Sequence, residues 1–582
     1  MIPRTYISGQ VSTSKVRRWR VTCAILFLIN SLVNIATAQK PKAALPKVLI
    51  NTTWNLPAGG TTWAAHTSAQ LTGALNKAQP GDIIKLDAGT VYTGNWNAPA
   101  KSNPNHKWIY VTSTAYNRLP APGTRVSPAD AVNMPKLVTP GSTRVMGFPD
   151  GANYWRFVGI EIYSNSSYHP SGYTPGVNFS YQLVDKHDYP GTKNLPDHIF
   201  FDRCYIHGDD THDLQHGVVG NFTYFAIFDS WVSDIHAKVF DTQAVLAWET
   251  PGPIKVVNNY LSAATENMML GGAQEIFGFI PSDVEVRNNY FFKPLAWVDK
   301  SVGTNTYVVK NLFECKDCQR VLLDHNTLEN NWVSGQVGDA VVITPRNAYA
   351  VGACAASDIT VTNNVLKNVV KGFRIGAADG SCGTSMNPTC TNACVSHNWD
   401  ISNNLVLIGD RTQKGFTGGQ TGLAELYGQP DRLNQTWVPI TDLILQHNTA
   451  VPFGSDTSYF GIYFVADGFP APPWNPPYLT DNVWILDNVL PRQVFSGHCP
   501  EGTAAEANCL YYPPTPYDYT QRFYGNVMWK EQDAVHTWTT GNDVSSTPIT
   551  YVNPPIDYTL SSPRWTTTSD GKLAGVDVSQ LP

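Results

Sequence analysis

Carboxylates, histidines and lysines gather between residues 207 and 300, where their types and spacing could support chemistry. The run from His207 to Asp213 reads His-Gly-Asp-Asp-Thr-His-Asp, and its oxygens are the hard ligands that calcium prefers. Asp241 and Glu266 stand beside apolar, strand-like residues and could complete such a site or exchange protons. Both features have a simpler alternative, because polar runs commonly form solvated turns and single carboxylates commonly cap turns.

The elements that must position these residues are marked by a repeat. Eight asparagines recur at intervals of roughly 40 residues, a period typical of stacked structural repeats. Most follow two apolar residues in alternation and precede another one two positions later, as in Val284-Glu-Val-Arg-Asn-Asn-Tyr-Phe291. The repeated positions are Asn259, Asn289, Asn326, Asn364, Asn404, Asn448, Asn488 and Asn526.

Alternation of apolar and polar residues predicts short strands, with a bend at each asparagine pair. Asparagine tolerates left-handed backbone geometry, and its amide both donates and accepts hydrogen bonds. Asparagines stacked at successive bends can therefore bond to each other and to turn backbone. The pattern predicts an internal asparagine ladder in a solenoid, with weaker copies upstream in which Cys204 and Ser230 take the ladder position.

Composition agrees with one elongated, strand-rich domain, because the chain has 45 Gly, 41 Pro and only 15% charged residues. The one persuasive amphipathic helix lies near residues 71–78, and we expect it to cover the open end of the coil stack. The predicted organisation is a leader over 1–38, a cap and first coils over 39–150, coils over 151–530, and a tail and cap over 531–582. Residues 165–196 and 413–434 are predicted to be long loops, and the tail from Thr540 onward is predicted to wrap the last coil.

The first 38 residues resemble an export signal. Basic residues precede an apolar stretch from Val21 to Ala38, which ends in Ala-Thr-Ala before Gln39. An uncleaved membrane anchor is the competing interpretation. The formal net charge of -6 becomes more negative once this basic leader is removed, which argues against nucleic acid as a partner.

Of the ten cysteines, Cys23 would leave with the leader, and export would place the other nine in an oxidising compartment. Cys499 and Cys509 flank a short loop and are expected to form a disulfide, as are two of Cys354, Cys382, Cys390 and Cys394. For Cys315 and Cys318 the spacing favours a turn disulfide or two buried thiols over a metal site, since no matching CxxC lies nearby. Cys204 is expected to be buried and inert.

These residues together resemble a known superfamily. The asparagine ladder, the Asp-Ile-Ile-Lys-Leu-Asp-Ala-Gly opening at 82–89 and the closing Asp570-Gly-Lys-Leu-Ala-Gly-Val-Asp577 are similar to the right-handed parallel β-helix, or pectin lyase-like, superfamily. The resemblance covers nearly all of the mature chain. It implies an all-β, right-handed parallel β-helix solenoid with an internal asparagine ladder and a short N-terminal capping helix.

The resemblance also implies where chemistry should lie. In lyases of this superfamily the groove follows the strand and turn after the ladder bend, and coils are about 4.8 Å apart, so residues 3 to 12 positions after each ladder position converge. The residues expected to bind substrate are His212, His236, Asn267, Trp297, Asn330, Trp332 and Arg374. The residues expected to hold calcium are Asp209, Asp210, Asp213, Asp241 and Glu266.

The implied reaction is β-elimination on an acidic, uronate-containing polysaccharide. It needs positive charge to stabilise the developing enolate and a base to remove the proton. Lys238 or Lys293 could be that base, with Asp241 and Glu266 also catalytic, because the pKa of lysine falls readily near another cation. Trp297 and Trp332 could stack on sugar rings or could simply pack beneath loops.

Two alternatives stay open. A glycoside hydrolase would use paired carboxylates about 5 to 9.5 Å apart, such as Asp241 with Glu266 or Asp209 with Asp241, without calcium. A non-catalytic solenoid would bind glycans or act as an adhesin. In each case we expect a secreted monomer whose partner is a polysaccharide or cell-surface glycan, with no nucleic acid and no membrane after leader cleavage.

Overall fold

The chain divides into two compact units, Met1–Lys40 and Pro41–Pro582. The predicted leader over 1–38, with its cleavage pattern, lies outside the described residues, and all that follows concerns the second unit. The computed structural model describes residues 40–57, 59–139, 144–164, 182–185, 194–238, 240–247, 249–272, 278–301, 306–346, 354–379, 394–417, 422–431, 436–453, 461–466, 480–491, 495–496, 511–512, 523–529, 542–545, 551–553, 557–560 and 568–582.

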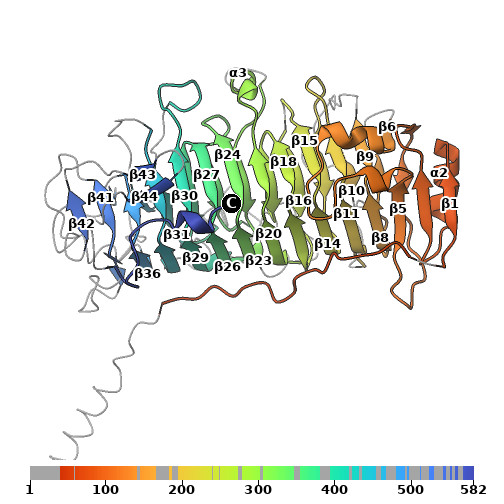
Figure 1. Ribbon diagram of the computed structural model, residues 1–582. Coiled ribbons are helices and arrows are strands. Elements are labelled where there is room, and N and C mark those ends of the chain that lie inside the picture. The colour runs from red at the N-terminus through yellow and green to blue at the C-terminus, as the bar shows by residue number, and fades with distance from the viewer. Residues whose placement is uncertain are drawn as a thin grey trace, which may run out of the picture. The chain divides into compact units, whose positions relative to one another are not determined.

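Three long sheets make up the second unit, and we name them A, B and C in the order in which each coil visits them (Figure 1). Sheet A has 15 strands, sheet B has 14 and sheet C has 13 within the described ranges. Neighbouring strands pair in parallel throughout the three sheets, except for one antiparallel pair at the rim of sheet C. Parallel crossovers are right-handed in almost all proteins. The predicted right-handed parallel β-helix is therefore confirmed.

The strands of sheet A are β1 (Thr62–Ala65), β2 (Ile83–Leu86), β5 (Ile109–Ser113), β8 (Asn153–Val158), β11 (Asp197–Asp202), β14 (Thr223–Phe228), β17 (Ile254–Val257), β20 (Ser282–Arg287), β23 (Cys318–Asp324), β26 (Ala355–Thr362), β29 (Val395–Ser402), β33 (Ile440–Gln446), β36 (Thr480–Leu486), β39 (Tyr511–Tyr512) and β40 (Phe523–Tyr524). Those of sheet B are β3 (Val91–Thr93), β6 (Lys136–Thr139), β9 (Glu161–Ser164), β12 (Tyr205–His207), β15 (Trp231–Ile235), β18 (Tyr260–Ala263), β21 (Tyr290–Phe292), β24 (Thr327–Asn331), β27 (Val365–Val369), β30 (Leu405–Ile408), β34 (Thr449–Val451), β37 (Val489–Leu490), β41 (Val527–Trp529) and β42 (Asp543–Ser545).

The strands of sheet C are β4 (Trp96–Asn97), β7 (Met146–Gly147), β10 (Gln182–Asp185), β13 (His216–Val219), β16 (Gln243–Ala247), β19 (Glu266–Leu270), β22 (Asn311–Cys315), β25 (Asp339–Ile343), β28 (Lys371–Gly376), β31 (Ala424–Asp431), β35 (Ile462–Ala466), β38 (Phe495–Ser496) and the antiparallel β32 (Thr436–Val438). Outside the sheets lie the hairpin β43 (Tyr551–Asn553) and β44 (Asp557–Leu560), the helices α2 (Ser68–Lys77) and α3 (Val298–Ser301), and the 3-10 turns η1 (Tyr116–Arg118), η2 (Pro128–Asn133), η3 (Leu295–Trp297) and η5 (Val578–Gln580).

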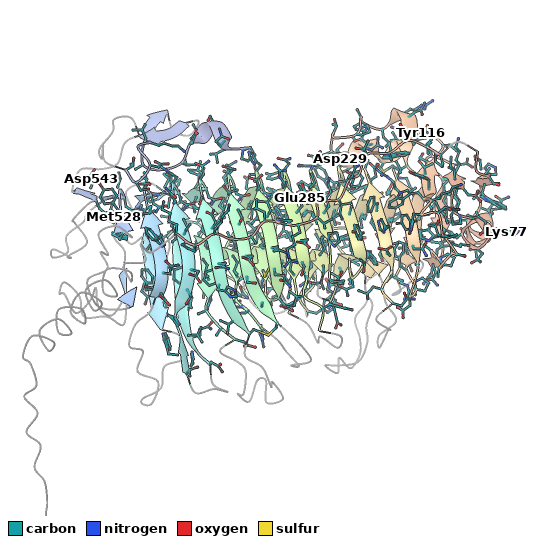
Figure 2. The ribbon with its side chains drawn as sticks, turned by 90° about the horizontal axis from the view of Figure 1, so that it is seen from below. Lys77, Tyr116, Asp229, Glu285, Met528 and Asp543 are labelled. Carbon is teal, nitrogen blue, oxygen red and sulfur yellow. A yellow bond between two sulfur atoms is a disulfide. The ribbon has the colours of Figure 1, made fainter. Side chains whose placement is uncertain are left out.

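Helix α2 covers the N-terminal end of the stack, as predicted. Thr67 caps it by accepting a hydrogen bond from the backbone of Gln70, and Leu71, Ala74 and Leu75 are buried in the core that runs through the coils. Figure 2 shows Lys77, the last residue of α2, at one end of the stack and Met528 and Asp543 at the other.

The asparagine ladder is present at all eight predicted positions. Each amide nitrogen donates to the Oδ1 of the next asparagine at 2.9 to 3.0 Å, from Asn259 through Asn526. Asn542 extends the ladder by one further coil, accepting from Asn526 at 2.9 Å, and sequence spacing did not reveal it because only 16 residues separate the two. Ser230 and Cys204 continue it at the other end through backbone-to-side-chain bonds.

The left-handed residue at each bend is the one before the ladder asparagine. Asn258, Asn288, Asn363 and Asn403 have φ of 56 to 57°, while His325, His447 and Asp487 take the same role with φ of 53 to 57°. The two residues of each pair thus have different roles. The first adopts the left-handed backbone conformation of the bend, and the second makes the hydrogen bond of the ladder. A buried asparagine that bonds to neighbours above and below satisfies polar groups that the interior would otherwise leave unpaired.

Two segments that the sequence predicts as long loops contain strands of sheet C. Strand β10 lies inside 165–196 and β31 lies inside 413–434. The predictions of uninterrupted loops were wrong, and in β31 the reason is that the outward Glu425 and Gln429 are polar, so that the strand signal is weak. The C-terminal segment, residues 568–582, was expected to wrap the last coil, but it packs across several coils, where Asp577 and Val576 donate backbone bonds to Asn403 and Thr449.

Residues 41–57, which we call the strap, run along the outer face of sheet A (Figure 1). The backbone N–H groups of Ala44 and Lys47 donate to Asp358 and Asp283 at 3.0 and 2.9 Å. Further along, Trp54 donates from its indole to Asp202 at 2.7 Å. The strap therefore spans the coils from β26 back to β8.

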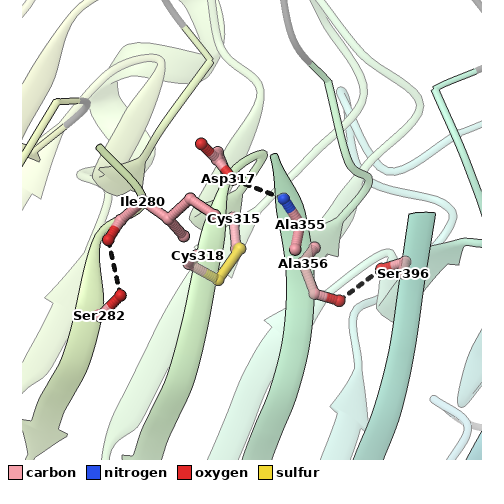
Figure 3. Close-up of a disulfide and its surroundings, with 8 residues drawn as sticks. All are labelled: Ile280, Ser282, Cys315, Asp317, Cys318, Ala355, Ala356 and Ser396. Carbon is pink, nitrogen blue, oxygen red and sulfur yellow. Dashed lines mark hydrogen bonds between the residues drawn. A yellow bond between two sulfur atoms is a disulfide. The ribbon is translucent and has the colours of Figure 1, made fainter. Parts of the chain in front are cut away.

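Two disulfides lie at the corner between sheets C and A. Cys315 bonds to Cys318 within one coil, and Cys354 bonds to Cys394 across two coils. Both predictions are confirmed, whereas Cys499 and Cys509 lie outside the described residues. Between the first two cysteines, Asp317 accepts a hydrogen bond from the backbone of Ala355 at 2.8 Å (Figure 3). Cys204 is a buried free thiol, as expected, and burial raises its pKa to about 12.

Candidate functional site on the outer face of sheet C

Charged side chains point outward from consecutive strands of sheet C because their neighbours in the chain point inward. Glu314 lies between Phe313 and Cys315, and Arg374 between Phe373 and Ile375, all four of which belong to the core. Alternation along a strand then sends the intervening side chain to the other face. Register places Met269, Glu314, Val342, Arg374 and Glu425 opposite one another in successive strands.

The first group on this face, which we call the carboxylate–amide cluster, consists of Gln243, Glu266, Asn311 and Glu314. Gln243, Glu266 and Asn311 face one another in register on β16, β19 and β22. Gln243 donates from its amide to Glu266 at 2.5 Å, and Asn311 donates to Glu314 at 3.2 Å. All four are buried, with at most 3% exposure.

Two lysines and one aspartate border this cluster. Lys310 lies 3.7 Å from Glu266 and forms an ion pair with Asp241, whose side chain is 48% exposed. Lys316 lies 3.2 Å from Glu314. Although burial lowers the pKa of Lys310, Glu266 and Asp241 outweigh it and raise that pKa above its usual value. Lys310 is thus an ammonium ion that partly reaches the surface next to an accessible carboxylate.

The two buried carboxyl groups differ in protonation. Burial, then Glu314 and Asp241, raises the pKa of Glu266 to about 8. Burial also acts to raise the pKa of Glu314, but Lys316, a bond from Asn311 and a bond with Glu266 bring it below its usual value. Glu266 is therefore protonated at neutral pH and Glu314 ionised, so that the pair shares one proton.

Three oxygens of the cluster lack a hydrogen-bond donor. They are Gln243 Oε1, Glu266 Oε1 and Asn311 Oδ1, all buried and on successive strands. Buried acceptors are nearly always satisfied in folded proteins. Carboxylate and amide oxygens in one patch fit a hard cation such as calcium, although the ammonium of Lys310 already lies near Glu266.

The second group, which we call the Arg374 cluster, consists of Asp339, Lys371, Arg374, Glu425 and Tyr427 on β25, β28 and β31. Lys371 is buried and bridges Asp339 at 3.1 Å and Glu425 at 2.7 Å. The Tyr427 hydroxyl donates to Glu425 at 2.6 Å, and Arg374 lies 4.4 Å from the centre of the Tyr427 ring. Arg374 is the most accessible cation of the group, with 27% of its side chain exposed.

The predicted calcium ligands do not all meet at one point. Asp209 accepts bonds from the backbone of Thr211 and His212 at 2.8 Å and from the His212 ring at 2.5 Å, so it closes its own turn. Asp210 is exposed, and Asp213 is buried and accepts from the backbone of Lys238. These residues precede β13, which lies two strands away from β19 in sheet C. At a strand spacing of roughly 4.8 Å, one ion cannot bind both these residues and Glu266.

Three predicted substrate-binding rings are packed away from the surface. Trp297 and Trp332 are 4% and 0% exposed and share a hydrophobic cluster with Tyr307 and Phe416. His236 is buried against Tyr307, with ring centres 4.4 Å apart, and its Nε2 donates to the carbonyl of Asp209 at 2.8 Å. Packing beneath loops, the alternative considered for the tryptophans, describes their position.

Lys293, Asn267 and Asn330 point into the coil. Lys293 is fully buried, and its ammonium donates to the carbonyls of Ala263, Ala264 and Thr265 and to Asn267. Asn330 donates to the carbonyl of Lys293 at 2.8 Å. This setting favours a structural cation over the predicted base. Lys238 is exposed and, with Asp241, is one of the two predicted catalytic residues that a polymer can reach.

The most connected residues of the face were missed by sequence reasoning. Gln243, Lys310, Asn311, Glu314, Asp339, Glu425 and Tyr427 lie on or beside sheet C, whereas most of the search window after the ladder asparagine falls on sheet B. A usable signal was present, because single charges flanked by apolar residues, as in Leu-Phe-Glu-Cys and Phe-Arg-Ile, mark outward positions of a buried strand.

A separate group lies under the C-terminal segment. Among the residues that the structure describes, the only His, Cys, Asp or Glu side chains whose ligand atoms all fall within 4.8 Å of one another are His447, Asp487 and Asp570. His447 and Asp570 border a cavity of about 630 Å³ that other residues between 570 and 580 help to line. Ser569 and Gln446 also bond to Asp487, and Lys572 lies 3.5 Å from Asp570. The group therefore holds the tail against the coils.

The chain is thus a parallel β-helix protein with a charged face on sheet C. No protein-family model and no curated protein matches it. Solved structures that resemble it include an alginate lyase from Paenibacillus sp. str. FPU-7 (11% identity, 71% of this chain and 97% of that one, TM-score 0.31), the PL6 family alginate lyase AlyGC (11%, 90% and 59%, 0.43) and the pectate lyase Pel9A (12%, 72% and 80%, 0.34). Likeness at this level says nothing about individual side chains.

Helices of the described ranges are all too short or too polar to cross a membrane.

Proposed function

We propose that the outer face of sheet C cleaves an acidic, uronate-containing polysaccharide by β-elimination, with Asp241 and Lys310 at the reaction centre. The observation that supports this most is the pairing of an accessible carboxylate with a partly accessible ammonium, beside a buried cluster of oxygens. β-Elimination requires this combination of a base and a positive charge.

In this reaction a base removes the proton from C5, the carbon next to the uronate carboxylate. The electron pair forms the C4–C5 double bond, the C4–O bond breaks, and the leaving oxygen takes a proton from water. Asp241 is the group that removes the proton, because its side chain is half exposed. Lys310 neutralises the substrate carboxylate, because its raised pKa keeps it an ammonium.

Calcium fits the neighbouring oxygens, and Glu266, Gln243 and Asn311 would hold it. When bound it would supply further positive charge to the substrate carboxylate as a Lewis acid. The protonated state of Glu266 then matters, since a calcium ligand must first lose its proton. Binding should therefore strengthen as pH rises through about 8.

The Arg374 cluster supplies a second place for a uronate. Arg374 lies on β28, and Lys310 directly precedes β22, two strands away in sheet C. At the usual spacing of strands the two residues are about 10 Å apart. A polymer lying along the coils would present another carboxylate there. Lys371 is buried between Asp339 and Glu425 and orients those groups instead of meeting the substrate.

A glycoside hydrolase is less well supported by this geometry. Its two carboxyl groups must be about 5 to 9.5 Å apart, with space for the sugar or for water. Glu266 and Glu314 have the divided pKa values that such a pair needs, but they bond to each other and are 0% and 1% exposed. A binding protein without catalysis remains the second class.

Export to an oxidising compartment agrees with this proposal, since the polymer substrate lies outside the cell. Two disulfides within the coils fit such a location. We propose a secreted protein that acts on a polysaccharide or a cell-surface glycan.

The test is a panel of polyuronates and neutral polysaccharides, each incubated with and without EDTA. Ultraviolet absorption of the unsaturated product should rise in step with reducing ends for a polyuronate. Reducing ends without absorption would show a hydrolase, and the absence of both products with retained binding would show a glycan-binding protein; either result overturns the proposal.

Variants locate the centre on any substrate that is cleaved. Asp241→Asn and Lys310→Met should each lower kcat by about 10²- to 10⁴-fold, the usual contribution of a proton-transferring or charge-stabilising group. Lys367→Met is the matched control, because Lys367 is an exposed lysine that pairs with Glu329 on sheet B. Full activity of both test variants would remove the proposed centre.

A further inference from the structure

Lys293 is fully buried inside the coil, and its ammonium donates hydrogen bonds only to groups of the protein. Its exposure is 0%, and its ammonium lies 2.8 Å from the carbonyl of Ala263, 2.9 Å from that of Ala264, 3.1 Å from that of Thr265 and 2.9 Å from Asn267 Oδ1. Three N–H donors thus serve four oxygens. Burial lowers the pKa of Lys293 to about 7, an effect that Glu266 opposes.

These acceptors all belong to one corner, where the preceding coil turns from β18 into β19. Three consecutive carbonyls accept from the same ammonium, and the carbonyl of Thr265 also accepts from the backbone N–H groups of Lys310 and Asn311 at 3.3 and 3.0 Å. Asn267 adds to the corner by donating to the carbonyls of Leu261 and Phe292 at 2.6 and 3.0 Å. One ammonium therefore fixes the turn between two sheets.

Glu266 sits in the middle of that corner, with its side chain on the other face. Its neighbours in the chain, Thr265 and Asn267, both accept from Lys293, whereas Glu266 itself meets Gln243 and Lys310 outside the coil. Movement of the corner would shift the Glu266 carboxyl relative to both partners.

From this arrangement we infer that Lys293 is a positioning residue, an internal ammonium tie that fixes the β18–β19 corner and so sets where Glu266 stands on the outer face. The inference rests on the proposed function for the importance of Glu266. The contacts of Lys293 with the corner next to Glu266 do not depend on any substrate. Lys293 does not touch the reacting atoms.

The position of the Glu266 carboxyl distinguishes this role from one of filling space. In Lys293→Met the corner loosens and the carboxyl moves away from Gln243, which donates to it in the wild type. The C=O stretch of the protonated carboxyl should then move to higher frequency, because its oxygen loses a hydrogen-bond donor. A residue that only fills space would leave that band unchanged.

The experiment records at pH 5 the infrared C=O band of the protonated Glu266 carboxyl, identified by its loss in Glu266→Gln, together with hydrogen exchange of backbone 263–267. For Lys293→Met we expect the shifted band and exchange about tenfold faster at this corner. An unmoved band, or exchange that is unchanged, overturns the inference.

Lys310→Met serves as the matched control from the outer face. It removes a cation 3.7 Å from Glu266 but leaves the contacts of Lys293 in place, so exchange at 263–265 should stay slow. Should Lys293→Met fail to fold, Asn267→Ser removes one of the four acceptors, and it must move both readouts in the expected direction for the inference to stand. Neither readout needs a polysaccharide, so this test can fail while the proposed function holds, and the reverse.

Discussion

The guanidinium of Arg374 lies 4.4 Å from the centre of the Tyr427 ring, one strand away on sheet C. The same tyrosine donates its hydroxyl to Glu425 at 2.6 Å, and Glu425 pairs with Lys371. The ring thus holds Arg374 beside this network, and Arg374 itself lies 3.7 Å from Asp339. With 27% of its side chain exposed, against 4% for Lys371, Arg374 is the cation of the cluster best placed to receive a carboxylate from outside.

Replacing Arg374 should weaken binding of an acidic polymer more than it slows the reaction. We expect Arg374→Met to raise KM about tenfold with little change in kcat, because the residue is about 10 Å from Lys310 and meets a different sugar unit. Tyr427→Phe should raise KM less, since the ring that supports Arg374 remains. Steady-state kinetics on the substrate found in the panel check both, and a loss confined to kcat in Arg374→Met would contradict the assignment.

The raised pKa of Glu266 makes stability depend on pH. A carboxyl group that holds its proton more tightly in the folded protein loses stability as pH rises from its ordinary pKa of 4.5 to about 8, because the unfolded chain is then the state that has already ionised. Glu266→Gln is uncharged at every pH and should escape this loss. Its advantage over the wild type should grow by about 5 kcal/mol across that window.

Thermal unfolding between pH 5 and 9 measures this advantage. Asp299→Asn, which changes a carboxylate that is 84% exposed and pairs with Lys414, is the control and should show no growth with pH. A constant difference between Glu266→Gln and wild type would mean that Glu266 is ionised throughout.

The architecture was largely readable from the sequence because the ladder asparagines carry a local signature. Asn289 and Asn364 each follow a turn residue and two alternating apolar residues, and the interior demands that pattern in every coil. Position within a coil is therefore encoded locally. Strand β31 was missed for the opposite reason. Its outward residues Glu425 and Gln429 are polar because they belong to the charged face, and they do not follow the pattern that the core requires.

The site was readable only in part, because contact between coils depends on register that the sequence does not state. Glu266 and Arg374 were singled out, but their partners Gln243, Glu314 and Tyr427 come from strands about 20 to 50 residues away. Lys293 was chosen for its type, and nothing in its neighbourhood predicts that its ammonium faces inward.

Breaking the ladder in its centre should destabilise the whole stack. Asn326 is fully buried, donates to the carbonyl of Val286 and to Asn364, and accepts from Asn289. Asn326→Leu leaves those groups unpaired, so we expect a loss of about 2 to 4 kcal/mol. Asn76→Leu, the same change at an exposed position of α2, should lie within about 0.5 kcal/mol of wild type. Equal thermal unfolding of the two variants would contradict the structural role of the ladder.

Replacing the ring of Trp54 should detach the strap from sheet A. Trp54 donates to Asp202, stacks on Tyr110 with centres 5.1 Å apart, and covers Arg156 at 4.7 Å. Arg156 is 1% exposed and bonds to Asp202 at 2.7 Å, so the ring shields a buried ion pair from water. In Trp54→Ala we expect that shield to be lost and the strap to be cut faster by protease within 41–57.

Lys47→Ala provides the comparison, because Lys47 holds the strap through its backbone N–H, which donates to Asp283 and survives the change of side chain. Limited proteolysis followed by mass spectrometry should therefore find the strap protected in Lys47→Ala and cleaved about ten times faster in Trp54→Ala, a difference of about 1.4 kcal/mol in local opening. Equal rates in the two variants would mean that backbone bonds along sheet A hold the strap without help from the tryptophan. Faster cleavage in both would instead point to the charge of Lys47 as part of the attachment.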